Sequence, residues 1–199
     1  MVIAHHLIWT GYGWWLPNDP RGSGSQLIRK DILAELGALH FGRKRIQPAG
    51  REIRQFMERA APRLEHQTLT FDEMVRQEIG AVFGDVIRMN AYTCYACAVM
   101  PDHVHLVIRK HRHLAEEMME ALKDASREHL RGSGLVPARH PVWTGGLGWK
   151  VFLNRPDEVR RTIRYAKNNP IEIDLPAQEW SFVREYDGWP LHRKRTVED

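Results

Sequence analysis

The chain has 199 residues, of which 43% are hydrophobic and 27% are charged, so its composition is that of a globular domain and excludes a disordered or collagen-like chain. Lysine and arginine number 29 against 25 acidic residues, and the formal net charge of +4 weakly favours an anionic partner. No apolar run approaches the roughly 20 residues of a membrane span, and two cysteines exclude a disulfide framework. We expect one cytoplasmic domain over residues 1–199 with no membrane partner.

The first predicted element is a short strand, His5–Thr10. A loop rich in glycine, proline, asparagine and aspartate follows it. Trp14 and Trp15 belong to this loop, where they either stack on unpaired bases or pack within the loop itself. Arg21, further along the same loop, is a candidate phosphate ligand.

Residues 26–67 are predicted to be an insertion, because they contain few aliphatic residues for a core of their own. A helix is expected within it near Arg51–Ala60. The cluster Arg43-Lys44-Arg45 precedes that helix and is a candidate contact for a DNA backbone. A solvated surface is the alternative for this cluster.

Predicted helices and strands begin directly after the insertion in the sequence. Thr70-x-x-Glu73 matches a capping box, and the apolar positions after it predict an amphipathic helix. Residues 91–100 predict a strand, and Pro101-Asp102 predicts a turn. His103–Lys110 then predicts a second strand, because its apolar residues alternate.

The last third of the chain predicts a helix, a strand or hairpin and a further helix. An amphipathic helix is expected from Leu114 to a point before Gly132, and a strand or hairpin within Pro141–Leu153. Pro156 and the acidic residues beside it predict a helix start, and Pro170 predicts its end near residue 168 or 169. Residues 176–199 form a tail that contains the basic run His192–Arg195.

Without the insertion, the order is strand, helix, strand, strand, helix, strand and a further helix. The first six elements predict an α+β, ferredoxin-like (split βαβ) fold with an antiparallel sheet. Two helices would cover one face of the sheet. The other face would remain open for a site, and the additional C-terminal helix follows the last strand.

The sequence His103-Val104-His105 is the sharpest chemical signal. Residues two apart on a strand point to the same side, so both imidazoles leave one face and form a candidate metal-binding pair. A chance coincidence of two histidines on a half-exposed strand is the alternative. Val104, Leu106 and Ile108 support the strand and therefore the shared face.

The segment Tyr165-Ala166-Lys167-Asn168-Asn169-Pro170 is the second signal. Tyr165 and Asn169 are four residues apart, so they occupy neighbouring turns of one helix face. Tyr165 lies away from the apolar stripe of this helix. Taken alone, it reads more readily as a surface tyrosine before a helix stop.

Together, these two segments resemble the active site of the HUH single-tyrosine transposases, including the REP-associated branch. The resemblance extends to Trp9-Thr10-x-Tyr12 and to Met100-Pro101-Asp102 directly before the histidine pair. It covers roughly residues 4–174. Residues 26–67 are longer than a compact member needs.

The resemblance implies a metal-dependent enzyme that nicks and joins single-stranded or hairpin DNA. His103, His105 and Asn169 would bind Mg²⁺ or Mn²⁺, and Tyr165 would attack the phosphodiester. The expected products are a 5′-phosphotyrosine link and a free 3′-hydroxyl. Whether such an enzyme acts as a monomer or a homodimer is left open.

Further residues are candidate DNA contacts or structural residues. On the final helix, Arg161 and Arg164 join the loop and insertion residues as candidate DNA contacts.

Cys94 and Cys97 have the spacing of a metal or redox pair, but residues three apart on a strand face opposite ways, which favours buried structural thiols.

Two other functions compete with the transposase. One is a protein that binds a DNA hairpin and no longer cuts it. The other is a metal-dependent nuclease that uses water in place of Tyr165. A covalent protein–DNA adduct separates the three, because only the transposase forms one.

Overall fold

A four-stranded antiparallel sheet forms the centre of the computed structural model, which describes residues 1–24, 26, 30–146 and 148–190. The strands are β1 (Ala4–Thr10), β4 (Cys94–Val99), β5 (His103–Arg109) and β6 (Trp149–Leu153). Their spatial order is β4-β5-β1-β6, and every neighbouring pair is antiparallel. This is the split βαβ order, so the predicted fold class is confirmed.

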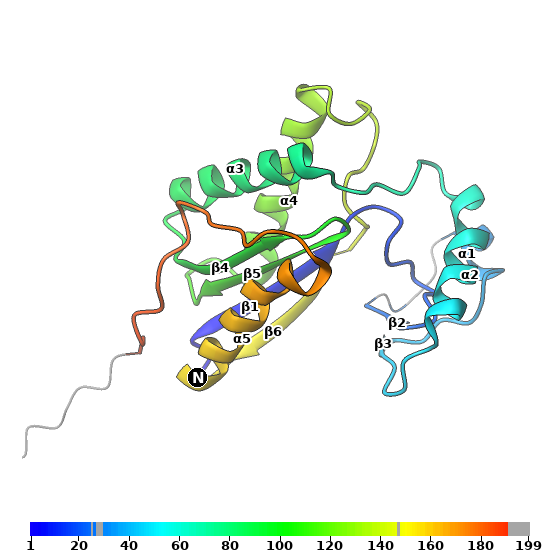
Figure 1. Cartoon of the computed structure of the whole chain (residues 1–199). Coiled ribbons are helices and arrows are strands. Elements are labelled where there is room, and N and C mark those ends of the chain that lie inside the picture. The colour runs from blue at the N-terminus through cyan, green and yellow to red at the C-terminus, as the bar shows by residue number, and fades with distance from the viewer. Residues whose placement is uncertain (25, 27–29, 147, 191–199) are drawn as a thin grey trace, which may run out of the picture.

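Three long helices cover the two faces of this sheet (Figure 1). They are α3 (Glu73–Met89), α4 (Ala115–Gly132) and α5 (Pro156–Asn168). The larger core lies between the sheet and α3 and α4, where Leu106 of β5 meets Phe83 and Met118, all fully buried. A smaller core lies on the other face, where Val107 of β5 meets Val159 and Ala166 of α5.

The start of α3 differs from the prediction. The helix begins at Glu73, and its N-cap is Asp72, whose side chain accepts a hydrogen bond from the backbone N–H of Val75. Asp72 is therefore in the position expected for Thr70. Aspartate is as good an N-cap as threonine, and the local sequence offered both.

The segment between β1 and α3 folds into an N-terminal lobe, the described part of residues 11–68, seen at the right of Figure 1. Its short elements are β2 (Gly22–Ser23), α1 (Asp31–Ala34), β3 (Gly42–Arg43), α2 (Gly50–Ala60) and the 3₁₀ turn η1 (Ala61–Arg63). Leu16, Leu33, Leu36 and Phe56 form a small core within it. Residues 26–67 do not build this core alone, because Leu16 comes from the loop before them.

After α5 and the 3₁₀ turn η2 (Ile171–Ile173), the chain runs along the outer edge of β4. Val183 forms an isolated parallel bridge with Cys94, and the N–H of Arg184 donates to the Cys94 carbonyl at 2.8 Å. The hydroxyl of Tyr95 donates to Asp187 at 3.1 Å. The tail thus covers an otherwise unpaired strand edge. The basic run His192–Arg195 lies outside the described residues.

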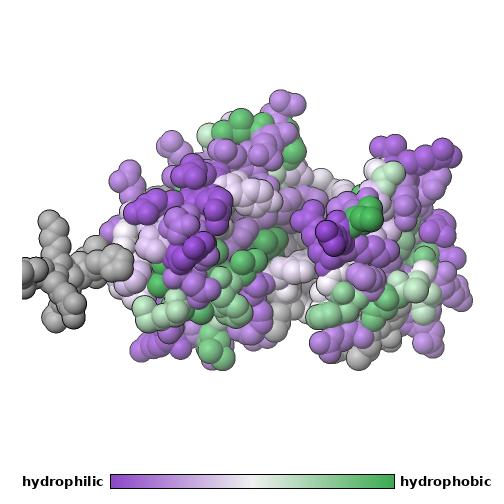
Figure 2. Space-filling view, turned by 90° about the horizontal axis from the view of Figure 1, so that it is seen from below, coloured by the Kyte–Doolittle hydropathy of each residue, from purple (hydrophilic) through white to green (hydrophobic). Residues whose placement is uncertain are grey.

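Figure 2 views the molecule from below and shows hydrophilic residues over most of the main body and of the N-terminal lobe, with smaller groups of apolar residues on each. Among the described residues, none of the helices has the length and apolar character needed to cross a membrane.

Candidate active site

His103 and His105 lie on the face of β5 that α5 covers. Their neighbours Val104 and Leu106 point into the larger core on the opposite face and are fully buried. The two Nε2 atoms are 3.0 Å apart, and the ring planes stand at 86°. His103 retains 24% of its side-chain surface, whereas His105 is buried.

The Nδ1 atom of each imidazole has a hydrogen-bond partner that fixes the ring. Nδ1 of His103 is 2.6 Å from a carboxylate oxygen of Asp102, and Nδ1 of His105 is 3.0 Å from Nε2 of His6. With a proton on each Nδ1, both Nε2 atoms keep their lone pairs and face the same point.

This arrangement fits a divalent cation. Two nitrogens, each about 2.1 Å from one ion and at right angles, lie about 3.0 Å apart, which matches the separation of the two Nε2 atoms. The described residues contain no group of three His, Cys, Asp or Glu side chains arranged to hold a metal. A third protein ligand to such a pair would therefore be an amide or a hydroxyl.

Asn169 is the amide beside the pair. It caps the C-terminal end of α5, and its side chain is a hydrogen-bond partner of His105. Its Nδ2 donates to the Tyr165 carbonyl at 2.7 Å, which fixes the side-chain orientation.

Tyr165 stands over the same pair from α5. Its ring centroid lies 5.4 Å from that of His105 and 6.0 Å from that of His6, in edge-to-face contacts. The side chain is nevertheless 49% exposed, so a large substrate can reach it. The structure therefore brings together all four residues singled out in the sequence, from segments about 60 positions apart.

Burial keeps His105 and His6 neutral. It lowers the pKa of His105 to about 2, with further lowering by His103 and His6, and it lowers the pKa of His6 to about 4. Burial opposes ionisation of Asp102, but its hydrogen bond and charge interaction with His103 outweigh this, so the pKa of that carboxyl is lowered. The result is a neutral His105 imidazole backed by the neutral imidazole of His6, with the Asp102 carboxylate beside His103.

His6 and Asp102 are site residues that the sequence pattern does not single out. Asp102 reads only as a turn residue, although its place directly before His103 is a usable signal. His6 reads only as part of a strand. Its contact with His105 depends on the pairing of β1 with β5, in which Ile8 lies opposite His105. The register of β1 against β5 cannot be predicted from any local sequence pattern.

The predicted DNA contacts lie in three separate places. Arg161 and Arg164 are exposed on α5, and Arg161 is one helical turn before Tyr165. The cluster at 43–45 lies on the N-terminal lobe, with Arg43 and Arg45 exposed and Lys44 half-buried.

The loop candidates are engaged in packing. Arg21 forms an ion pair with Asp19 at 2.8 Å and lies 4.0 Å from the Trp15 ring. The indole N–H of Trp14 donates to the Leu69 carbonyl, and that of Trp15 donates to the Gly22 carbonyl. The structure thus shows the packing alternative for these three residues, and their DNA contact stays a prediction.

Cys94 and Cys97 do not face opposite ways, and that prediction is wrong. A β-bulge at Tyr95 pairs Cys94 with Ile108 and Cys97 with Leu106, so both thiols enter the larger core. Burial raises the pKa of both thiols, that of Cys94 to about 12. The interpretation as buried structural residues agrees with this environment.

Comparison with known proteins gives one family match. Residues 61–151 match the family model described as "Transposase IS200 like". The matched stretch contains α3, β4, β5 and α4, and therefore the imidazole pair, but it ends before α5. No match is found among curated proteins.

Two solved structures resemble the chain in outline. One is described as a transposase from Deinococcus radiodurans R1, with 17% identity, a TM-score of 0.41 and coverage of 89% of this chain and 94% of that one. The other is a REP-associated tyrosine transposase bound to a REP hairpin, with 10% identity, a TM-score of 0.43 and coverage of 92% of each chain.

Proposed function

We propose that this chain, whose residues 61–151 match the family model of IS200-like transposases, is a metal-dependent enzyme that cuts and rejoins single-stranded DNA, with Tyr165 as its nucleophile. One observation carries the proposal. An exposed tyrosine from α5 stands against a pair of imidazoles from β5, whose Nε2 atoms have the separation of two ligands on one ion.

The reaction we propose is a transesterification. The phenolic oxygen of Tyr165 forms a bond to phosphorus while the bond from phosphorus to the 3′-oxygen breaks. The phenolic proton is lost to solvent, and the 3′-oxygen leaves with the bonding electrons and takes up a proton. The 5′-phosphotyrosine is itself a phosphodiester. The 3′-hydroxyl of a second DNA end can therefore attack its phosphorus, release the Tyr165 oxygen and join the two DNA ends.

His103, His105 and Asn169 would hold the cation, Mg²⁺ or Mn²⁺. When bound, it polarises the scissile phosphate and offsets the charge that develops there. His6 and Asp102 would accept the Nδ1 protons of His105 and His103, which directs both Nε2 lone pairs into the site. Two neutral imidazoles and an amide leave the positive charge of the ion available to a phosphate.

The exposure of Tyr165 suits a polymeric substrate. A side chain with 49% of its surface accessible sits at the mouth of the site. Arg161, one turn earlier, and Arg164, next to it, are exposed on the same helix and would attract the DNA backbone. Hairpin DNA is the substrate form that we propose.

The test is a covalent adduct. Purified protein is incubated with Mn²⁺ and labelled single-stranded oligonucleotides that tile the DNA flanking its gene, and adducts are resolved on a denaturing gel. Wild-type protein should form an adduct, and Tyr165→Phe should form none while still binding DNA. Tyr92→Phe is the matched control, because Tyr92 is buried beside His113 and should leave the adduct unchanged.

The same gel separates the alternatives. An adduct in Tyr165→Phe would contradict the assignment of the nucleophile. Cutting without an adduct would favour the water-using nuclease. Binding without cutting by the wild-type protein would favour the hairpin-binding protein.

A further inference from the structure

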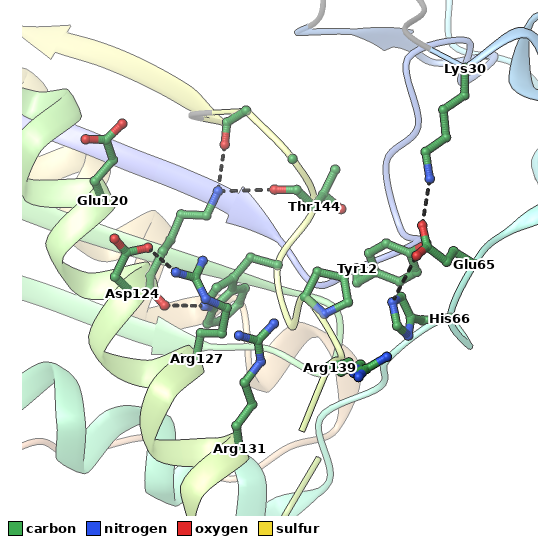
Figure 3. Close-up of a pocket in the computed structure, with 15 residues that line it drawn as sticks. Tyr12, Lys30, Glu65, His66, Glu120, Asp124, Arg127, Arg131, Arg139 and Thr144 are labelled. Carbon is green, nitrogen blue, oxygen red and sulfur yellow. Dashed lines mark hydrogen bonds and ion pairs between the residues drawn. The ribbon is translucent and has the colours of Figure 1, made fainter. Parts of the chain in front are cut away.

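A second concave site lies where the N-terminal lobe meets the main body (Figure 3). This cavity of about 680 Å³ is bounded by α4, by the segment 139–146 and by the side chains of Tyr12 and His66. Its volume falls within the range of roughly 300–1,000 Å³ typical of ligand sites. The transposase chemistry proposed above uses none of its residues.

The cavity is lined by an excess of positive charge. Five cationic side chains, Lys30, Lys123, Arg127, Arg131 and Arg139, face three acidic ones, Glu65, Glu120 and Asp124. Three of the cations already have an ion pair, Lys30 with Glu65 at 2.9 Å, Arg127 with Asp124 at 2.8 Å and Arg131 with Glu128 at 3.7 Å. The Arg131 pair is the longest of the three, so the positive charge least offset by neighbours comes from Lys123, Arg139 and Arg131.

These three cations differ in how firmly they are held. Lys123 is buried, and its ammonium donates to the carbonyls of Thr144 at 3.1 Å and Gly146 at 2.6 Å. Nε of Arg131 donates to the His140 carbonyl at 2.8 Å, which fixes the guanidinium at the rim. Arg139 is exposed and has no ion pair within the described part of the chain.

One of the three donors of the Lys123 ammonium remains after these two hydrogen bonds. Burial lowers the pKa of Lys123 to about 8, so the group is still mostly protonated at neutral pH. A charged donor at the wall of a basic cavity is suited to an anionic group of a ligand.

The cavity also offers an aromatic wall. Tyr12 is half-buried, and its ring stands edge-to-face with the rings of His66 at 5.7 Å and His140 at 5.2 Å. His140 is fixed in turn, because its Nδ1 accepts from the Val142 N–H and its Nε2 is 2.9 Å from the Gln67 carbonyl. Aromatic rings beside arginines are the usual combination in sites for unpaired bases.

The cavity and the imidazole pair share the end of β1. Gly11 donates its N–H to the Asp102 carbonyl at 2.7 Å and accepts from the Thr144 hydroxyl at 2.7 Å. Asp102 precedes His103, and Thr144 lines the cavity. One residue therefore connects the walls of both sites.

From this geometry we infer that the cavity holds one unpaired nucleotide of the single-stranded DNA substrate, with its phosphate at Arg131 and Arg139 and its base against Tyr12. The inference rests on the proposed function, because it takes DNA as the ligand. It adds a binding site on the side of the sheet opposite Tyr165.

The test measures binding without cutting. All variants are made in the Tyr165→Phe background, and the probe is a fluorescent oligothymidylate of about 20 nucleotides. Arg139→Gln and the double change Arg131→Gln, Arg139→Gln should raise Kd and lower the salt slope of log K by about 0.7 for each phosphate that is no longer neutralised. Arg112→Gln, exposed beyond the far end of β5, is the control and should change neither.

Tyr12 provides the second arm. Tyr12→Ala should raise Kd at least fivefold, because loss of one stacked base costs about 1–3 kcal/mol. Tyr12→Phe should bind like the parent, because it keeps the ring. Thermal melting identifies any variant that fails to fold, and Arg139→Gln, which breaks no ion pair within the described chain, remains informative if the double variant is unstable.

The outcomes separate this inference from the proposed function. If the parent binds the probe but Arg139→Gln and Tyr12→Ala bind equally well, the cavity is not a nucleotide site, and the adduct test on Tyr165 is unaffected. If only the arginine variants weaken binding, the inferred stacked base is wrong. If the parent binds no single-stranded DNA, the proposed function fails first.

Discussion

At the residue scale, the two imidazoles of β5 owe their geometry to what holds their outer nitrogens. Asp102 and His6 each occupy an Nδ1, so His103 and His105 can direct only Nε2 into the site. The sequence predicted the pair and its shared face because a strand has a period of two. It could not predict the role of His6, because the contact of His6 with His105 joins residues that are 99 positions apart.

His103→Ala should weaken Mn²⁺ binding more than tenfold and abolish cutting, because only one of the two nitrogen ligands remains. The folded state should change by less than about 1 kcal/mol, since His103 is part-exposed and the core lies on the opposite face of β5. Isothermal titration with Mn²⁺ and urea unfolding measure the two effects.

His40→Ala is the control for this experiment, because His40 is exposed on the N-terminal lobe. Unchanged Mn²⁺ affinity in His103→Ala would contradict the proposed cation site.

The metal-free protein should lose stability in acid. The pKa values of His6 and His105 are lowered by burial to about 4 and about 2, whereas the unfolded chain titrates near 6.5. Unfolding therefore takes up protons below about pH 6.5, and the free energy of unfolding falls as the pH decreases. Each group contributes a slope of at most about 1.4 kcal/mol per pH unit.

Urea denaturation with a chelator, between about pH 6.5 and about pH 4.5, measures this slope. His6→Asn should remove about half of the part due to the two histidines. An identical slope in that variant would show that His6 is not buried in its neutral form.

At the element scale, the sequence predicted a helix end or a strand face correctly where neighbouring residues alone determine it. Pro156 and Pro170 set the limits of α5, and the structure places the helix at Pro156–Asn168 as predicted, within a residue. The bulge at Tyr95 was not predicted, because it arises from the pairing of β4 with β5 rather than from the residues of β4. A one-residue bulge reverses the side of the sheet that the following residues face.

The start of β6 depends on Gly148. Its φ is +78°, and a Cβ there would lie 2.3 Å from the Ile8 carbonyl oxygen of β1. Gly148→Ala should therefore lower the free energy of unfolding by more than about 2 kcal/mol, through strain and through displacement of β6. Gly145→Ala is the matched control, because a Cβ there meets nothing within 4 Å.

Urea unfolding of the two glycine variants gives the comparison. Equal stability of Gly148→Ala and Gly145→Ala would mean that β6 tolerates a shift against β1.

At the scale of the whole molecule, the sequence predicted the four-stranded fold but not how its parts join. The order of strands and helices follows from local periodicity, and only a few topologies accommodate it. The small core of the N-terminal lobe needs Leu16 from outside the expected insertion. The basic cavity needs the lobe and α4 together, so no single segment of sequence contains it.

DNA binding by the whole protein should weaken steeply with salt. Neutralising Arg43–Arg45 as three glutamines should lower the slope of log K against log salt by up to about 2, or about 0.7 for each phosphate that these residues neutralise. Fluorescence anisotropy at several salt concentrations measures it. Arg51, Arg54 and Arg59, exposed on α2 of the same lobe, are the comparison set.

An unchanged slope after neutralising Arg43–Arg45 would mean that this cluster is a solvated surface that does not contact DNA. A slope lowered equally by both sets of substitutions would indicate a general effect of the charge of the lobe.

The place of α5 after all four strands of the central sheet has a consequence for biosynthesis. Chains leave the ribosome N-terminal end first and begin to fold as they emerge. All four strands, both helices of the larger core and the imidazole pair precede Pro156. On the proposed mechanism, a nascent or prematurely terminated product that stops before α5 would carry the histidine ligands but no nucleophile, so the ability to break DNA would be acquired only once α5 has been synthesised.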